Sequence, residues 1–311
     1  MSVSVVVNNK NGANYIADCL NSIYAQTFSP LEVIFFDNCS HDKSCEIVRK
    51  EFPQVKIFEA DQPIGLACAR NSALSYCNGE FVAFLDVDDT WLPSKIDSCL
   101  QLFSNPDIAL VYTDALYVGS TSFLQSDRTD LVDGSCFRDL LKNYCVPFST
   151  IVFRRNIIPM SGVVFHESLD LALDQEFILR VSSTSKIGVV KECLTRILLR
   201  DDSESSTNLL SFIREREHVE EILALTVPDF KKSYSRELRY SRRRLAVDVI
   251  ARYIETAKDP KIREIRKMVS SKLLLLYSVV LLIVRDTGLL KLIRSLRLLV
   301  LRTTRARKST R

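Results

Sequence analysis

Residues 84–89, with the sequence FLDVDD, place three carboxylates at the end of an apolar run. The run, residues 80–86, has the length and composition of a buried β-strand. Carboxylates crowded at one edge of a sheet repel one another and are costly to bury unless a cation neutralises them. Mg²⁺ and Mn²⁺ prefer one or two carboxylates together with phosphate oxygens. The stretch therefore indicates a metal-bridged diphosphate site, and the alternative is a solvated acidic loop that precedes a helix at 93.

Strand-like and helix-like segments alternate around this stretch through the first hundred residues. Apolar runs predict strands at 3–7, 31–36, 55–58 and 80–86, and apolar periodicity predicts helices at 15–23, 42–52 and 65–77. This alternation predicts βαβ units and a mostly parallel sheet. Ligands of such sheets bind beyond the carboxyl ends of the strands. Polar clusters fall at three of these ends, at residues 8–9, 37–38 and 86–89.

The middle of the chain carries weaker signals and no internal repeat. We expect a helix at 93–103, a strand at 109–118, a loop at 127–134, a strand at 147–153, a helix at 168–182 and a polar loop at 201–208. From residue 208 onward the pattern is helical and rich in charge. A chain of 311 residues is long enough for one α/β domain of about 200 residues and an additional region.

The C-terminal end is strongly basic, although the whole chain carries a net charge of only +4. Residues 261–311 contain fourteen Lys and Arg against two acidic residues, a charge of +12, so the remainder carries −8. The apolar run 273–284 is shorter than the roughly 20 residues of a membrane span. Residues 289–301 have the pattern of a basic amphipathic helix at an anionic membrane surface. Nucleic acid is the alternative partner, and the long leucine runs disfavour it.

The cysteines and histidines show no pattern of a metal or disulfide site. Nine cysteines are scattered without a C-x-x-C pair, and the three histidines lack metal-ligand spacing. A hydrophobic content of 47% provides a core without such a staple. The first residues run directly into a strand-like segment rather than a signal-peptide core. We therefore expect a reduced, cytoplasmic protein.

Four motifs in the first 104 residues resemble those of family 2 glycosyltransferases with the GT-A fold. They are the strand at 3–7 followed by Asn11, the turn at 37–42 (DNCSHD), the segment at 65–71 (GLACARN) and the acidic motif at 86–89 (DVDD). All four occur in the family's order. The resemblance implies an α/β fold of the GT-A nucleotide-diphospho-sugar transferase type, a mostly parallel mixed sheet flanked by helices, with a helical C-terminal region added.

A weaker resemblance continues to about residue 208. Residues 148–154 are similar to the strand before the acceptor site, and residues 162–169 to the family's G-G-F-D-E-x-L stretch. Residues 174–180, DQEFILR, resemble E-D-x-D-L-x-L-R, and alignment on Arg180 places the family's catalytic aspartate at Asp174. The departures from the family pattern are Leu173 in place of an acid, Cys39 in place of glycine, and Asn8-Asn9 in place of Pro-Thr.

The resemblance implies a role for each candidate residue. The nucleotide sugar would be bound by Asn8, Asp37, Asn38, Arg70 and Asp86; Mn²⁺ or Mg²⁺ would be held by Asp88 and Asp86; and the general base would be Asp174. The ion would stabilise the departing diphosphate. The base would deprotonate an acceptor hydroxyl as it attacks the anomeric carbon with inversion.

Simpler interpretations apply to the same residues. Asn and Asp are common in turns, which accounts equally well for residues 8 and 37–38. A structural ion pair accounts for Arg70, and a helix N-terminus that favours an acid accounts for Asp174. Trp91 is better explained by core packing than by stacking on a sugar ring.

We therefore predict an inverting glycosyltransferase, of the hexosyl- or N-acetylhexosaminyltransferase class, acting in bacterial surface polysaccharide synthesis such as that of O-antigen. It would move a sugar from a nucleotide diphosphate sugar, UDP-sugar by preference, to a hydroxyl of a glycan or lipid-linked acceptor. Residues 1–208 would form the GT-A domain, with a nucleotide-sugar half at 1–104 and an acceptor half at 105–208. Residues 209–311 would form a basic helical region that holds the enzyme at the cytoplasmic face of the inner membrane.

Three other functions compete with this prediction. A catalytically inactive nucleotide-binding module recruited to the membrane is supported only by the missing acid at Leu173. A processive polysaccharide synthase is disfavoured because the single tryptophan, Trp91, is not part of a Q-x-x-R-W motif. A dehydrogenase is disfavoured because no G-x-G-x-x-G follows the first strand.

Overall fold

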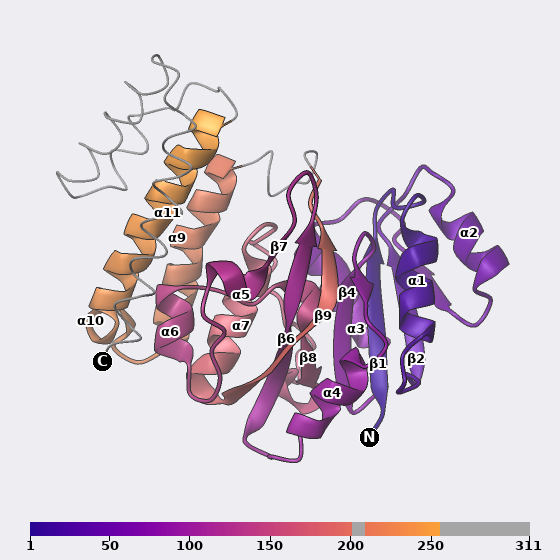
Figure 1. Ribbon diagram of the computed structural model, residues 1–311, viewed down its shortest axis with the longest axis horizontal. Coiled ribbons are helices and arrows are strands. Elements are labelled where there is room, and N and C mark those ends of the chain that lie inside the picture. Colours follow the sequence, from indigo (N-terminus) through magenta and orange to yellow (C-terminus); the bar gives the residue numbers. More distant parts are fainter. Residues whose placement is uncertain (201–208, 256–311) are drawn as a thin grey trace. The chain divides into compact units, whose positions relative to one another are not determined.

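The computed structural model describes residues 1–200 and 209–255, and the chain divides into two units after Glu237. The described part of the first unit holds a nine-stranded sheet in the order β3-β2-β1-β4-β8-β6-β9-β5, with β7 paired to β6 (Figure 1). The strands are β1 (Val3–Asn9), β2 (Glu32–Asp37), β3 (Lys56–Glu59), β4 (Phe81–Asp86), β5 (Thr90–Trp91), β6 (Ile108–Val118), β7 (Phe123–Leu124), β8 (Val152–Arg154) and β9 (Lys186–Leu198).

Helices flank this sheet along the whole first unit. They are α1 (Ile16–Tyr24), α2 (Ser44–Glu51), α3 (Leu66–Ser75), α4 (Lys95–Leu102), α5 (Gln125–Arg128), α6 (Phe137–Lys142), α7 (Leu173–Thr184), α9 (Leu209–Thr226) and α10 (Phe230–Ser233). Two short 3₁₀ helices are η1 (Phe148–Thr150) and η2 (Arg155–Ile157). Helix α11 (Ser235–Glu255) begins in the first unit and continues into the second.

Strands β3, β2, β1 and β4 pair in parallel, and β1 is buried on both faces. The valines of β1 are 0% exposed, and β1 pairs in parallel with both β2 and β4. Such a strand appears in a sequence as a continuous β-branched run rather than an alternating one. Strand β8 is antiparallel to β4 and β6, so the sheet is mixed. The predicted GT-A type of mostly parallel mixed sheet is confirmed.

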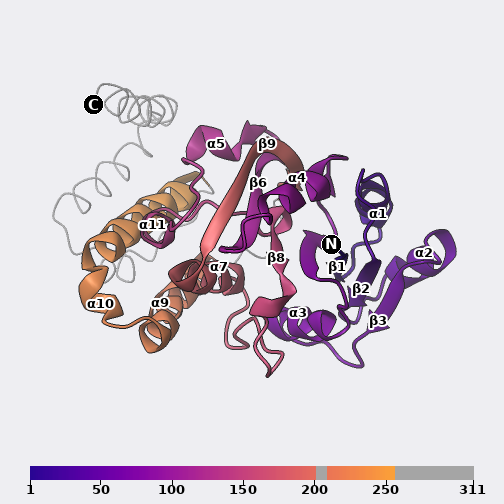
Figure 2. The ribbon, with the colours of Figure 1, turned by 90° about the horizontal axis from the view of Figure 1, so that it is seen from below.

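Alternate residues of the strands pack against different helices on the two faces. Val3, Val5 and Val7 share a core cluster with apolar residues of α1, α2 and α4. Helices α3 and α7 cover the opposite face, as Figure 2 shows. On that face Phe84 lies 5.7 Å, centroid to centroid, from Phe165, which in turn lies 5.3 Å from the ring of Phe177. This aromatic cluster joins β4 to α7.

Three segments differ from the sequence-based expectation. Residues 147–153 were expected to be one strand, but they form η1 and then β8, because the amide of Thr150 bonds to the carbonyl of Pro147 (3.1 Å). The helix expected at 168–182 begins only at Leu173. Strand β9 was not expected, and it pairs in parallel with almost the whole of β6. The pairing of β9 with β6 shifts register around Thr113 and Asp114 of β6. The shifts interrupt the alternation of side chains along β9, which weakens its signal in the sequence.

The helical pattern expected after residue 208 is confirmed for the described residues 209–255. The first compact unit includes α9 and α10, which follow the domain boundary predicted at 208. Within the described residues, no helix has both the length and the apolar character needed to cross a bilayer. The basic amphipathic segment predicted at 289–301 lies outside the described residues.

A buried carboxylate fastens the start of β2 to its neighbours. The side chain of Glu32 is 3% exposed and accepts hydrogen bonds from Ser4 Oγ, Lys56 Nζ and the Asn78 amide, each 2.6 Å long. Burial alone would raise the pKa of Glu32, but these donors stabilise the charged form and lower the pKa to about 2.

We predict that Glu32 makes the stability of the first unit pH-dependent in acid. An acid whose pKa is lower in the folded state stabilises the fold above its unfolded pKa and loses this contribution as the pH falls towards 2. The loss should be about 2 kcal/mol, since one pKa unit equals about 1.4 kcal/mol and the exposed Lys56 is screened. Urea unfolding between pH 5 and 2 should show a flatter pH profile for Glu32→Gln, whereas Glu51→Gln, at an exposed site in α2, should keep the wild-type slope.

Candidate functional site

The polar residues predicted to bind a ligand gather at the carboxyl ends of three adjacent strands. In the parallel pairing, Asn8 of β1 lies opposite Asp86 of β4, and Asn9 lies opposite Asp37 of β2. The amide of Asn38 bonds to the carbonyl of Asn9 (2.8 Å). The structure therefore brings four predicted residues, Asn8, Asp37, Asn38 and Asp86, to one edge of the sheet.

Helix α3 sends a buried arginine to the same edge. Arg70 is 4% exposed, and its Nη2 lies 3.1 Å from Oδ1 of Asp86. Its guanidinium carbon lies 3.7 Å from the ring centroid of Phe148 and within about 6 Å of the rings of Phe84 and Phe165. Cation–π attraction to these rings and the ion pair with Asp86 hold the guanidinium in place. Arg70 thus places a fixed positive charge beside Asp86.

The three carboxylates that follow β4 have different environments. Asp86 and Asp88 are partly exposed, with 40% and 21% of their side chains accessible, and Asp88 pairs with Arg200 (3.4 Å). Asp89 is 5% exposed and accepts hydrogen bonds from Ser149 Oγ (2.5 Å) and the Leu198 amide (3.0 Å). Burial, and then repulsion from Asp86, raise the pKa of Asp89 well above its usual value. Asp89 is therefore a structural acid, and Asp86 and Asp88 are the two carboxylates at the rim.

Ser149 connects this acidic loop to the sheet. Its hydroxyl donates to Asp89 and accepts from the Asp86 amide (3.1 Å), and its carbonyl accepts from Trp91 Nε1 (2.8 Å). Trp91 is 4% exposed and packs in the core, as the sequence favoured. Ser149 lies in η1. This 3₁₀ turn, which replaces the expected strand, directs the Ser149 hydroxyl towards the acidic loop.

The two residues after β2 are held in a turn. Asp37 accepts hydrogen bonds from Asn9 Nδ2 (2.6 Å) and from the amide (2.8 Å) and hydroxyl (2.6 Å) of Ser40. Asn38 exchanges two hydrogen bonds with the backbone of Ile64, at 2.7 and 3.0 Å. These contacts match the turn-forming interpretation of both residues and join the turn to the loop before α3.

Asn8 differs from them because both polar atoms of its side chain are buried without a hydrogen-bond partner in the described structure. A buried amide that makes no hydrogen bond is costly, by about 1–3 kcal/mol for each group. Such a cost is expected where a ligand completes the hydrogen bonding.

Asp174 lies at the start of α7, within electrostatic reach of this edge. Burial raises the pKa of its carboxyl, the positive charge of Arg70 and a hydrogen bond from the Gln175 amide (2.8 Å) oppose the rise, and Asp86 adds to it. The Asp174 charge also adds to the effect of burial in raising the pKa of Tyr117 and of Tyr144. Asp174, Arg70 and Asp86 thus belong to one electrostatic cluster.

Comparison with known proteins agrees with this geometry. The family described as glycosyl transferase family 2 matches residues 4–156. Residues 4–156 belong to glycosyltransferase family 2. This segment contains β1 to β4 with their polar ends, Arg70 of α3 and the acidic loop, and it ends just after β8.

Three relatives share sequence with parts of the chain. An uncharacterised glycosyltransferase of Nostoc, alr2836, is 35% identical over 113 residues (35% of this chain and 34% of the relative). The UDP-Glc:alpha-D-GlcNAc-diphosphoundecaprenol beta-1,3-glucosyltransferase WfgD of Escherichia coli is 26% identical over 167 residues (53% and 65%). The putative teichuronic acid biosynthesis glycosyltransferase TuaG of Bacillus subtilis is 29% identical over 162 residues (49% and 62%). The chain thus spans less than two thirds of the length of each.

Two solved structures share the fold of this chain. TarS residues 1–349 of S. aureus, in complex with UDP-GlcNAc, superimposes with a TM-score of 0.64 at 20% identity, over 95% of this chain and 92% of that one. The mannosyltransferase PcManGT of Pyrobaculum calidifontis, in complex with GDP-Man and Mn²⁺, gives a TM-score of 0.56 at 18% identity, over 92% and 86%.

The carboxylates at the rim of the family 2 segment fit a divalent metal ion. Asp86 and Asp88 supply two hard oxygen ligands, the number that Mg²⁺ or Mn²⁺ uses beside phosphate oxygens. Asp89 does not join them, because its two oxygens are bonded to Ser149 and Leu198. Among residues 1–200 and 209–255, no three His, Cys, Asp or Glu side chains are grouped to hold an ion by themselves. The donor set is that of a site completed by a substrate.

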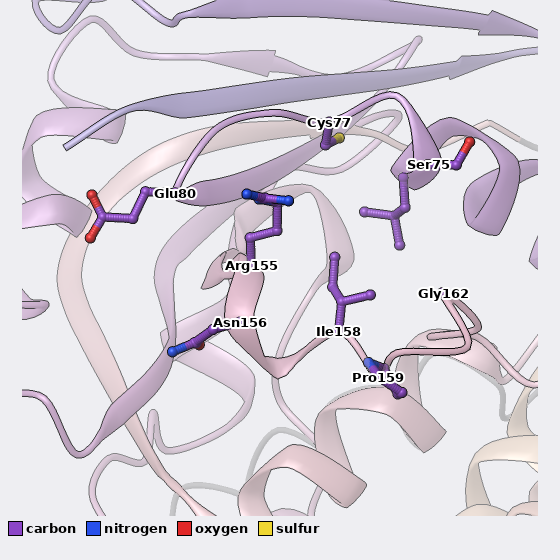
Figure 3. Close-up of a pocket in the computed structure, with 9 residues that line it drawn as sticks. Ser75, Cys77, Glu80, Arg155, Asn156, Ile158, Pro159 and Gly162 are labelled. Atoms are coloured by element: carbon purple, nitrogen blue, oxygen red, sulfur yellow. The ribbon is translucent and has the colours of Figure 1, made fainter.

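A separate cavity of about 500 Å³ lies at the other end of β4 (Figure 3). It is lined by residues such as Cys77, Glu80, Arg155 and Ile158, and Arg155 Nε donates to the carbonyl of Gly79 (2.7 Å). Strand β4 extends about 17 Å between this cavity and Asp86 at 3.3 Å per residue. The cavity is therefore not part of the candidate site.

Sequence reasoning missed Ser149 and Arg200 as neighbours of the acidic loop. Ser149 lies in a stretch that resembles the family pattern, but its contact with Asp89 depends on η1. Arg200 follows β9, which was not predicted, and it pairs with Asp88 across 112 positions of sequence. Neither residue belongs to a periodic pattern, so only the fold identifies them.

We predict that Ser149→Ala destabilises the acidic loop. The change leaves Oδ2 of Asp89 and the Asp86 amide without a partner, which should lower the free energy of unfolding by about 2–4 kcal/mol. Ser104→Ala, at an exposed serine that bonds only to the Gln101 carbonyl, should change it by less than about 0.5 kcal/mol. Equal effects of the two substitutions in chemical unfolding would show that Ser149 does not support the loop.

Proposed function

We propose that this protein transfers a sugar from a nucleoside diphosphate sugar to a hydroxyl of a glycan or lipid-linked acceptor. The observation that carries the proposal is the sheet edge where the buried Arg70 pairs with Asp86 beside Asp88, within electrostatic reach of Asp174 at the start of α7. A carboxylate pair, a buried guanidinium and an acid of raised pKa are the groups needed to hold a diphosphate and to activate a hydroxyl.

We propose that the donor lies across the carboxyl ends of β1, β2 and β4. The unpartnered amide of Asn8 supports a role in hydrogen bonding to the nucleotide. Asp37 and Asn38, held by Ser40 and Ile64, would shape the base-binding side of the site. A UDP-sugar is the preferred donor, because WfgD is named for UDP-Glc and the TarS structure contains UDP-GlcNAc.

Asp88 and Asp86 would hold Mn²⁺ or Mg²⁺, which supplies charge neutralisation to a departing diphosphate. The PcManGT structure, whose fold is similar, contains Mn²⁺. Arg70 would direct a preorganised positive charge at the diphosphate oxygens, because the surrounding aromatic rings hold its guanidinium in place and exclude water from it. The buried acid Asp89 would keep the loop in shape.

Asp174 would be the general base. Its carboxylate would accept the proton of the acceptor hydroxyl while the hydroxyl oxygen bonds to the anomeric carbon and the bond to the diphosphate breaks, which inverts the anomeric configuration. Leu173, which replaces the family's acid, is 2% exposed and packs in the interior. Its burial accounts for an apolar residue at this position.

The C-terminal region would bring the enzyme to its acceptor. We propose residues 1–208 as the GT-A domain and residues 209–311 as a region whose basic segment contacts the cytoplasmic face of the inner membrane. The +12 charge of residues 261–311 supports this proposal, since clustered cations bind anionic lipid. The context would be surface polysaccharide synthesis, as for the relatives WfgD and TuaG by their names.

We predict that UDP with Mn²⁺ stabilises the full-length protein. A ligand at 100 times its Kd stabilises the folded state by about 2.7 kcal/mol, and a thermal-shift panel of UDP, GDP and dTDP should show the largest shift for UDP. Asp88→Asn should reduce the shift with Mn²⁺ and UDP, whereas Asp97→Asn, an exposed acid of α4, should not. If no nucleoside diphosphate shifts the melting temperature, the protein does not bind such a donor.

We predict that Asp174→Asn lowers kcat by about 10²–10⁴-fold and leaves the thermal shift with UDP intact. The base must be ionised, so wild-type kcat/KM should fall as the pH drops through the pKa of Asp174, which burial raises above its usual value. This acid limb should be absent from the residual activity of Asp174→Asn. Asp139→Asn, at an exposed site in α6, is the matched control. Unchanged transfer by Asp174→Asn would exclude Asp174 as the base.

A further inference from the structure

One carboxylate oxygen of helix α9 receives three backbone hydrogen bonds from the segment that leads into α7. Oε2 of Glu215 accepts from the amides of Asp170 (3.1 Å), Leu171 (2.6 Å) and Ala172 (2.8 Å). The N-terminus of α7 has no side-chain cap of its own, and Ala172 is its N-cap residue. A negative charge at a helix N-terminus satisfies unpaired amides and interacts favourably with the helix dipole. Glu215 therefore caps α7 from another helix.

The capped end of α7 is the end that carries the proposed base. Asp174 is the second residue of α7, two positions after Ala172. Its carboxylate accepts from the adjacent Gln175 amide (2.8 Å), so the backbone of this first turn helps to set its position. The three amides held by Glu215 immediately precede that turn.

The same segment also fixes the helix that carries Arg70. Oδ1 of Asp170 accepts from the amide of Leu66 (3.0 Å), the first residue of α3. Gly65 allows this approach, because a Cβ there would lie 2.9 Å from the same oxygen. Asp170 thus caps α3, and the backbone of Asp170 is in turn held by Glu215.

A second contact joins α9 to this part of the chain. The Ser168 hydroxyl lies 2.8 Å from Nε2 of His218 and 2.8 Å from Nδ1 of His166. His218 stands one turn after Glu215 on α9, and its Nδ1 lies 3.1 Å from Glu221. Helix α9 therefore contacts the segment before α7 through His218 and through Glu215. The hydrogen bonds of Glu215 are the ones made to the amides that precede Asp174.

We propose that Glu215 is a positioning residue for sugar transfer, which holds the segment 170–172 so that Asp174 and, through Asp170, α3 with Arg70 keep their places in the site. The inference rests on the proposed function. It adds to that function a residue of α9, outside the segment that matches the family.

The test compares Glu215→Ala and Glu215→Gln with Glu217→Gln in the full-length protein. Glu217 is an exposed acid of the same helix, so its variant controls for the loss of one charge. We expect Glu215→Ala to lower kcat by about 10- to 100-fold, since a shift of 1 Å in a reacting group costs about that much. The donor KM and the thermal shift with UDP and Mn²⁺ should change less than kcat, because Arg70 keeps its own contacts with Asp86 and Phe148. Glu215→Gln keeps an acceptor oxygen and should restore part of the loss.

Two further readouts separate positioning from general stability. In Glu215→Ala the carboxyl of Asp174 should become less buried, so the acid limb of kcat/KM should move to lower pH. Amide hydrogen exchange of residues 170–174 should accelerate, and Glu217→Gln should show neither change. If wild-type transfers sugar and Glu215→Ala keeps its kcat and acid limb, this inference is wrong and the proposed function stands. If wild-type neither binds UDP nor transfers sugar, both are wrong.

Discussion

Repulsion among three carboxylates at the end of β4 is the constraint around which the site is built. Asp86 pairs with the buried Arg70 and Asp88 pairs with Arg200, whereas Asp89 is buried and its raised pKa favours the neutral acid. The two acids with cationic partners are the partly exposed ones. A ligand cation would therefore compete with arginines for Asp86 and Asp88 but leave Asp89 undisturbed. The division separates the acids available for binding from the one that stabilises the loop.

The burial of Arg70 makes this arrangement depend on distant parts of the chain. Its guanidinium packs on Phe148, so α3 must keep its position against that ring. The neighbouring Asn71 bonds through Oδ1 to the amides of residues 164–165 (3.0 and 2.9 Å), and Asp170 caps the same helix. Residues 164–172 therefore hold α3 and then lead into α7 with Asp174. The positions of Arg70 and of the proposed base Asp174 are coupled through one segment.

The fold and much of the site could be predicted because their signals are local. The valine run of β1 and the acids after β4 are continuous in sequence, and strand ends of a parallel sheet meet at one edge. Residues 147–153 are as apolar as a strand, yet they form η1 because Ser149 and its neighbours bond within a turn and to the acidic loop. The roles of Ser149 and Glu215 arise from contacts between remote segments, which no periodicity records. Asp174 was placed only by resemblance to a motif.

The family match ends at residue 156, whereas the proposed base lies at 174. The match therefore covers the part that would bind the donor, and the proposed base lies outside it. Arg180 of α7 joins this helix to the segment before it, because its guanidinium donates both to Glu176 (2.7 Å) and to the carbonyl of Val164 (2.5 Å). Glu215 holds the residues just before α7, and Arg180 joins the middle of α7 to Val164. The proposed base thus lies at the start of a helix that Arg180 and Glu215 both join to the segment before it.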